Sequence, residues 1–123
     1  MARVIALTAD LLFGSRLQSD LISGGHQVEL IGDAGRLRKR LQEELEPGPW
    51  VLVVDLTDPA LDGSAVLESL ESVPAMASAA TIGFYSHVEV GTRTRGKKAG
   101  FDKLVPRSRM AREGASLVAR LGG

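Results

Sequence analysis

Residues 50–63, WVLVVDLTDPALDG, decide the fold. The stretch begins with apolar, mostly β-branched side chains at positions 50–54, a run too short for a helix and without a polar face, which predicts a strand buried on both sides. Asp55 follows directly, and Pro59 and Gly63 mark the loop that leads to the next helix. Ligands of open α/β sheets bind at the carboxyl ends of the strands, so Asp55 is the first candidate site residue.

Composition limits the classes of protein that fit. A chain of 123 residues, 44% of them apolar, has the size of one compact domain with a sizeable core, and we expect a single domain over residues 1–123. Fifteen Lys and Arg balance fifteen Asp and Glu, so no overall field favours nucleic acid, anionic membranes or acidic substrates. Cysteine is absent, and His26 and His87 lie far apart, which excludes disulfides, thiolate chemistry and a zinc cluster.

The amino-terminal residues do not indicate export or membrane insertion. Their apolar run is interrupted by Thr8 and Asp10, is shorter than a membrane span and lacks a cleavage pattern. We therefore expect a cytoplasmic protein that does not enter a membrane.

Strands and helices alternate through the remaining chain. Short apolar runs predict strands, and spacings of three and four residues predict helices. The first expected helix carries Phe13, Leu17, Leu21 and Ile22. The second is capped by Asp33 and carries Ala34, Leu37, Leu41 and Leu45. The further expected strands are residues 4–7, 28–31, 81–85 and 103–105; a weak helix is expected over 87–100, and a last helix capped by Ser108. Five such alternations predict an α/β fold with a parallel sheet and helices on both faces.

Three segments carry a resemblance to a known family. They are DLTDPALDG at 55–63, SGGHQVEL at 23–30 and AGFDKLVPRS at 99–108. In these segments the chain resembles the receiver domains of two-component response regulators, including the chemotaxis regulators. The resemblance implies a three-layer, flavodoxin-like (βα)5 fold, doubly wound around a five-stranded parallel sheet of order 2-1-3-4-5.

The resemblance also implies a site. Receivers hold Mg²⁺ on two acids after the first strand, accept phosphate on an aspartate after the third, and place a Thr or Ser after the fourth strand and a Lys after the fifth. The Mg²⁺ and the Lys neutralise the negative charge that gathers around the acceptor. The matching positions here are Asp55 for the acceptor, Thr8 and Ala9 for the acids, Tyr85 for the hydroxyl and Arg107 for the lysine, with Asp10 and Ser86 one register away. One carboxylate beside the acceptor is a poor cage for Mg²⁺, so we expect a degenerate site without metal or cofactor.

A basic segment is the one local charge anomaly. Its cations are Arg93, Arg95, Lys97, Lys98, Lys103, Arg107, Arg109 and Arg112. It lacks interleaved aromatics and a recognition helix, which makes nucleic acid an unfavoured partner. The resemblance implies that the face of the fourth and fifth helices is the signalling and dimerisation face, so we expect a protein partner or a homodimer there.

Three hypotheses follow. The first is a non-enzymatic, phosphorylation-independent receiver-like module that binds a protein in signalling or regulation. The second is an active phosphoacceptor that uses Asp55 and Asp10 with Mg²⁺ and Arg107. The third is a binder of nucleic acid or of an acidic partner through residues 93–112. A nucleotide or flavin site is less favoured, because residues 8–15, TADLLFGS, lack a phosphate-binding cradle.

Purely structural roles compete with these hypotheses. Asp55 would then accept backbone N–H bonds at the strand end, Asp62 would be a turn residue before Gly63, Tyr85 a packing ring, and His87 an exposed polar residue at the start of a loop.

Overall fold

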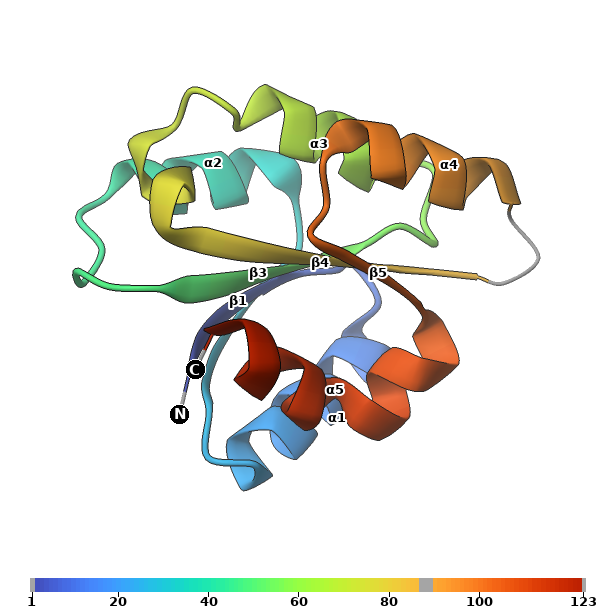
Figure 1. Ribbon diagram of the computed structural model, residues 1–123, viewed down its shortest axis with the longest axis horizontal. Coiled ribbons are helices and arrows are strands. Elements are labelled where there is room, and N and C mark those ends of the chain that lie inside the picture. Colours follow the sequence, from blue (N-terminus) through green and yellow to red (C-terminus); the bar gives the residue numbers. More distant parts are fainter. Residues whose placement is uncertain (1, 87–89, 123) are drawn as a thin grey trace.

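Five parallel strands form one sheet in the computed structural model, which describes residues 2–86 and 90–122. The strands are β1 (Arg3–Leu7), β2 (Gln27–Ile31), β3 (Trp50–Asp55), β4 (Ala79–Tyr85) and β5 (Lys103–Pro106). Their order is β2-β1-β3-β4-β5, and all four neighbouring pairs are parallel (Figure 1). The predicted sheet and strand order are confirmed.

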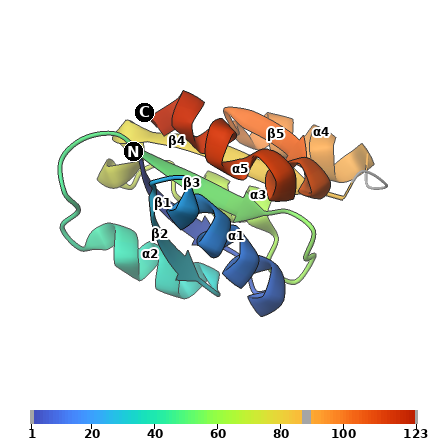
Figure 2. The same cartoon turned by 90° about the horizontal axis from the view of Figure 1, so that it is seen from below.

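Helices cover both faces of the sheet. On one face lie α1 (Leu11–Ser23) and α5 (Arg107–Gly122), side by side in Figure 2; on the other lie α2 (Ala34–Gln42), α3 (Gly63–Ser69) and α4 (Val90–Ala99). A 3-10 helix, η1 (Pro74–Ser78), leads into β4. The three-layer, doubly wound architecture that the sequence predicts is confirmed, since each crossover places its helix over one face.

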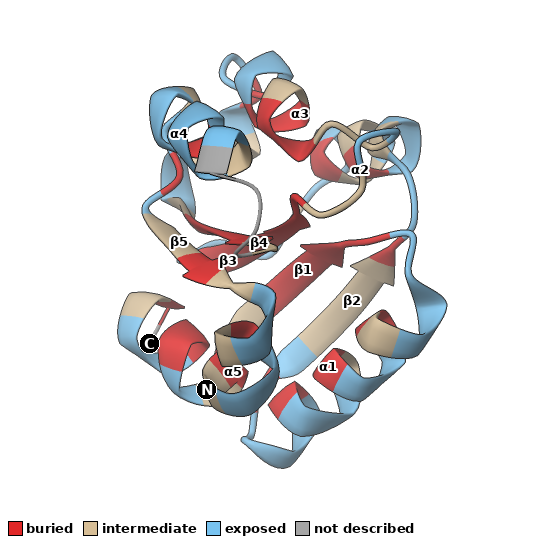
Figure 3. Cartoon of the chain, turned by 90° about the vertical axis from the view of Figure 1, so that its right-hand side faces the viewer, coloured by how far each residue is buried: buried red, intermediate tan, exposed pale blue. Residues whose placement is uncertain are grey.

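The central strand β3 separates two apolar cores. Every residue of β3 is buried; Trp50, Leu52 and Val54 face the core under α2 and α3, whereas Val51 and Val53 face the core under α1 and α5. Figure 3 shows the buried residues concentrated in the central strands and on the inward sides of the helices. Because β3 is covered on both faces, its last residue reaches the carboxyl edge of the sheet with its side chain still enclosed.

Several local expectations differ from the structure. Ile22 is exposed, because it lies on the solvent side of α1 while Leu17 and Leu21 point inward. The last helix begins at Arg107, so Ser108 lies in its first turn and not at the N-cap; β5 runs through Pro106 and leaves no loop residue for a cap. Of the weak helix expected over 87–100, residues 90–99 are helical, and residues 87–89, including His87, lie outside the described part of the chain.

No helix in the described ranges is both long and apolar enough to span a membrane.

Candidate functional site

The Asp55 carboxylate is buried at the end of β3, and both of its oxygens accept hydrogen bonds. Asp55 is only 2% exposed. Oδ2 accepts a hydrogen bond from the Thr8 hydroxyl at 2.7 Å. Oδ1 accepts two from Thr57, one from the backbone N–H at 2.8 Å and one from the hydroxyl at 2.6 Å. The structure therefore surrounds this acid with neutral donors from both neighbouring loops.

The Thr8 hydroxyl is held in the direction of Asp55. The Asp10 backbone N–H donates to Thr8 Oγ1 at 3.1 Å. A hydroxyl has a single proton to donate, and with one lone pair occupied by this N–H the proton is directed to Asp55. A hydrogen-bond chain thus runs from the Asp10 backbone through Thr8 to Asp55, and Thr8 is a donor where the resemblance implies a metal-binding acid.

Asp10 and Arg107 bind each other. The Asp10 side chain caps α1 by accepting the Phe13 N–H at 3.0 Å, and its Oδ2 accepts the Arg107 Nη2 at 2.8 Å. The Arg107 guanidinium also stacks over the Phe13 ring, 4.4 Å from its centroid. The Phe13 N–H, and then the Arg107 charge, hold the pKa of Asp10 below its ordinary value. The acid and the cation are thus paired with each other.

This donor set does not fit Mg²⁺. That ion prefers several oxygen ligands in near-octahedral geometry. Here Thr8 donates to Asp55, both Asp55 oxygens carry hydrogen bonds, and Asp10 faces a guanidinium. Within the part of the chain that is described, no group of three or more acidic or histidine side chains is placed to hold a metal ion.

Tyr85 and Ser86 meet Arg107 at a separate cavity. The half-buried Tyr85 ends β4 and packs against the core under α2 and α3, and Ser86 follows it. Both residues line a cavity of about 360 Å³ together with Thr57, Arg107 and residues of α1 and α5. Of the six predicted site residues, the structure thus joins Thr8 with Asp55, Asp10 with Arg107, and Tyr85 and Ser86 with Arg107.

Contacts within the protein engage some cations of the predicted basic partner surface and leave others exposed. Arg95 forms an ion pair with Asp62, Arg109 pairs with Glu113 in α5, and Lys103 is half-buried in β5. Exposed on α4 are Arg93, Lys97 and Lys98.

Asp62 does more than fill a turn. It adopts a left-handed conformation with φ of 47° and caps α3 by accepting the Ala65 N–H. The Arg95 guanidinium, and then the Ala65 N–H, lower the pKa of Asp62. The acid expected as a turn residue before Gly63 therefore ties the loop after β3 to α4.

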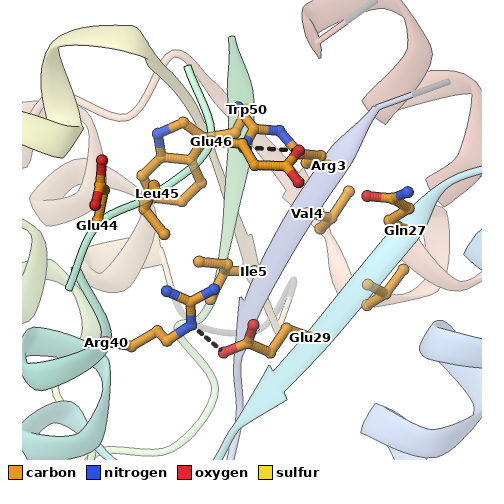
Figure 4. A pocket seen from close by; sticks show the side chains of 11 residues that line it. Arg3, Val4, Ile5, Gln27, Glu29, Arg40, Glu44, Leu45, Glu46 and Trp50 are labelled. Atoms are coloured by element: carbon orange, nitrogen blue, oxygen red, sulfur yellow. Dashed lines mark hydrogen bonds and ion pairs between the residues drawn. The ribbon is translucent and has the colours of Figure 1, made fainter. Parts of the chain in front are cut away.

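A second depression, of about 280 Å³, lies at the amino-terminal edge of the sheet, where β1, β2 and β3 begin (Figure 4). Its two cations are engaged by the protein: Arg40 binds Glu29 at 2.8 Å, and Arg3 donates to the carbonyls of residues 47 and 48 and lies 3.8 Å from Glu46. These contacts fasten the loop before β3 and α2 to the sheet, so this depression is the weaker candidate for a site.

Sequence reasoning missed two residues of the site. In the sequence, Thr57 stands out only as part of the central segment 50–63, and Phe13 only as an apolar residue of the first helix. The signal for Thr57 was present, since an aspartate commonly accepts the N–H of the residue two places later in an Asx turn. The position of Phe13 under Arg107 had no local signal, because these residues meet only in the folded chain.

Comparison with known proteins supports the fold. No protein-family model matches the chain, and no curated protein sequence matches it. Among solved structures it is similar to the chemotaxis response regulator CheY4 of Vibrio cholerae, with 15% identity, 98% of both chains covered and a TM-score of 0.81. It is also similar to a response regulator receiver domain of Francisella, with 17% identity and a TM-score of 0.80; the match covers 98% of this chain and 96% of that domain.

A third similar structure is the receiver domain of a sensor histidine kinase of Pseudomonas aeruginosa, with a magnesium ion coordinated in its active site cleft. The identity is 15% and the TM-score 0.81; the match covers 98% of this chain and 96% of that domain. Identities this low establish the architecture and leave the chemistry to the residues of the site. The chain has the flavodoxin-like fold of the CheY-like receiver domains of two-component signalling.

Proposed function

We propose that this protein is a degenerate receiver, a non-enzymatic module that binds a protein partner in signalling or regulation without being phosphorylated. The observation that carries the proposal is the state of the Asp55 carboxylate. It is buried, and each of its oxygens accepts a hydroxyl hydrogen bond.

Phosphoryl transfer to Asp55 would have to overcome this arrangement. An attacking carboxylate oxygen must leave its donors, and a hydrogen bond to a charged group contributes about 1.5–3 kcal/mol. The transferred group then needs cations on both sides. Asp10 and Arg107 are paired with each other, and Thr8 carries no charge. None of these residues is therefore arranged to neutralise the charge of a phosphoryl group.

Intact-mass spectrometry after incubation with acetyl phosphate and Mg²⁺ tests the proposal. We expect no adduct of one phosphoryl group on the wild type, and the same result for Asp55→Asn. The double variant Thr8→Asp, Ala9→Asp is the matched comparison, since it installs the acids that the resemblance implies. Stoichiometric labelling of the wild type that disappears in Asp55→Asn would instead favour the active phosphoacceptor, the alternative function.

The partner surface of this proposal is the exposed basic side of α4. Arg93, Lys97 and Lys98 leave one helix side positively charged, while Arg95 is held by Asp62. Such a side favours a partner with an acidic surface in the cytoplasm, and a second copy docking through the α4 and α5 face is the variant of this idea in which the chain is its own partner.

Charge reversal tests this surface. We expect self-association, measured by sedimentation across a salt series, to fall in Arg93→Glu, Lys97→Glu, Lys98→Glu if a copy is the partner, with Lys39→Glu on α2 as control. Steeply salt-dependent binding to duplex DNA that the triple variant abolishes would favour the third hypothesis, nucleic-acid binding. Insensitivity of every interaction to the reversal would remove α4 as the partner surface.

A further inference from the structure

We propose that the cavity beside Arg107 binds a small organic carboxylate, a monoanion with an apolar body. This goes beyond the proposed function and does not rest on it. The cavity has a volume of about 360 Å³ and lies between the ends of β3 and β4 and the facing sides of α1 and α5. Pockets for small molecules commonly measure about 300–1,000 Å³, so this one suits a metabolite of modest size.

The polar lining of the cavity suits an anion. Among the described lining residues, Tyr85, Ser86 and Ser108 carry hydroxyl groups and Arg107 a guanidinium, whereas the Thr57 hydroxyl donates its proton to Asp55. None of the described residues that line the cavity is an acid. Thr57, one of the lining residues, donates to the buried acid Asp55 through both its N–H and its hydroxyl. Together with the Thr8 hydroxyl, these donors solvate the Asp55 carboxylate.

Arg107 retains capacity for a second carboxylate. A guanidinium has five N–H donors in a fixed plane, and the bond to Asp10 involves Nη2. The Arg107 side chain is 44% exposed, and the Phe13 ring fixes the plane of the guanidinium from one side. A carboxylate entering the cavity can accept from the remaining N–H groups while Asp10 stays in place, which is the two-point geometry that carboxylates prefer.

The apolar walls and the charge balance define the ligand further. Phe13 and Ala111 line the cavity opposite the hydroxyls. An inorganic ion would leave these walls without a partner, whereas an organic body would bury them. Among the described lining residues the one cation is Arg107, which also pairs with Asp10. A phosphomonoester dianion would bring two negative charges to this shared guanidinium and a monoanion only one, so a monoanion matches the site better.

A titration followed by ¹H–¹⁵N NMR tests the proposal, with benzoate as probe, benzyl alcohol as its neutral counterpart and inorganic phosphate as the anion without an apolar body. We expect benzoate to shift the amide signals of Ser86, Ser108 and Ala111 in a saturable manner at millimolar concentration. Arg107→Gln should weaken binding about tenfold or more, since one charge-assisted hydrogen-bonded pair is lost. Arg120→Gln, at the far end of the same helix, should bind as the wild type does.

Arg107→Lys keeps the inference testable if Arg107→Gln does not fold, because it retains the charge and loses the planar fork. Its affinity for benzoate should lie below that of the wild type. The proposal is overturned if benzoate does not bind, if benzyl alcohol binds equally well, if phosphate binds more tightly than benzoate, or if the folded Arg107 variants bind benzoate as the wild type does.

Discussion

Replacing Thr8 by valine removes the donor that holds Asp55 Oδ2 while keeping a β-branched side chain of similar shape. Thr8 is 5% exposed and Asp55 2%, so water cannot readily replace the lost hydroxyl. The Thr8 hydroxyl lies 2.7 Å from Oδ2. Leaving a buried charged acceptor without such a donor lowers the free energy of unfolding by about 1.5–3 kcal/mol. We expect Thr8→Val to be destabilised by this amount.

Thr57→Val provides the matched comparison. In that variant Oδ1 keeps the Thr57 backbone N–H at 2.8 Å, and the half-buried position admits water. Its loss should therefore be smaller, about 1 kcal/mol or less. Thr92→Val in α4, remote in the chain from Asp55, should change the free energy of unfolding by no more than about 0.5 kcal/mol.

Urea unfolding measures these differences, and a double-mutant cycle isolates the Thr8–Asp55 interaction. In Asp55→Asn the charge is removed and the amide can donate to Thr8 Oγ1. Removing the Thr8 hydroxyl should then be less damaging, with a coupling of about 1 kcal/mol or more between the two positions. A neutral Thr8→Val, a Thr57→Val that is equally destabilised, or a coupling near zero would refute the view that the Thr8 hydroxyl stabilises the buried carboxylate.

Three further predictions concern other parts of the structure. Gly63→Ala should lower the free energy of unfolding by about 1–3 kcal/mol, because a Cβ there would lie 2.6 Å from the side chains of residues 54 and 56, whereas Gly91→Ala, with open space around it, should raise stability by up to about 1 kcal/mol in urea unfolding. The pKa of Asp62 is lowered in the folded state, so its ion pair stabilises above about pH 4, and the advantage of the wild type over Arg95→Gln in thermal melts should disappear as the pH falls through the lowered value; an advantage that persists in acid would contradict the pairing. His26→Ala should lose about 2–3 kcal/mol, because the buried imidazole accepts the Ala2 N–H and lies 3.1 Å from the Ala115 carbonyl of α5; calorimetry that gives an unchanged melting temperature would argue against this link.

The fold could be predicted because its signals are local. The five residues before Asp55 are all apolar and leave the strand no polar face, and β3 is buried on both faces of the sheet. Asp33 stands directly before a series of apolar residues at helical spacing, and it caps α2. The boundaries were less predictable: apolar Leu45 suggested a longer second helix, yet α2 ends at Gln42 and Leu45 reaches the core from the following loop. Tertiary packing thus decides where an element ends.

The site could be predicted in part. The resemblance implies an acid at the position of Thr8, and the sequence alone shows the threonine there, because the comparison needs only the position of a residue after a strand. The sequence could not indicate that the hydroxyl donates to Asp55, 47 positions away, or that Arg107 binds Asp10, 97 positions away. Such contacts depend on side-chain directions that the strand order brings together, and a residue type alone does not fix them.

The most direct test of the central claim is a titration with Mn²⁺, a paramagnetic substitute for Mg²⁺, followed through the amide signals of residues around Asp55. The account predicts no site-specific line broadening at Thr8, Asp55 and Thr57 at millimolar Mn²⁺, while the double variant Thr8→Asp, Ala9→Asp should show it. Broadening in the wild type that is centred on Asp55 and lost in Asp55→Asn would contradict the claim, because it would show that the carboxylate leaves its hydroxyl donors to bind a metal.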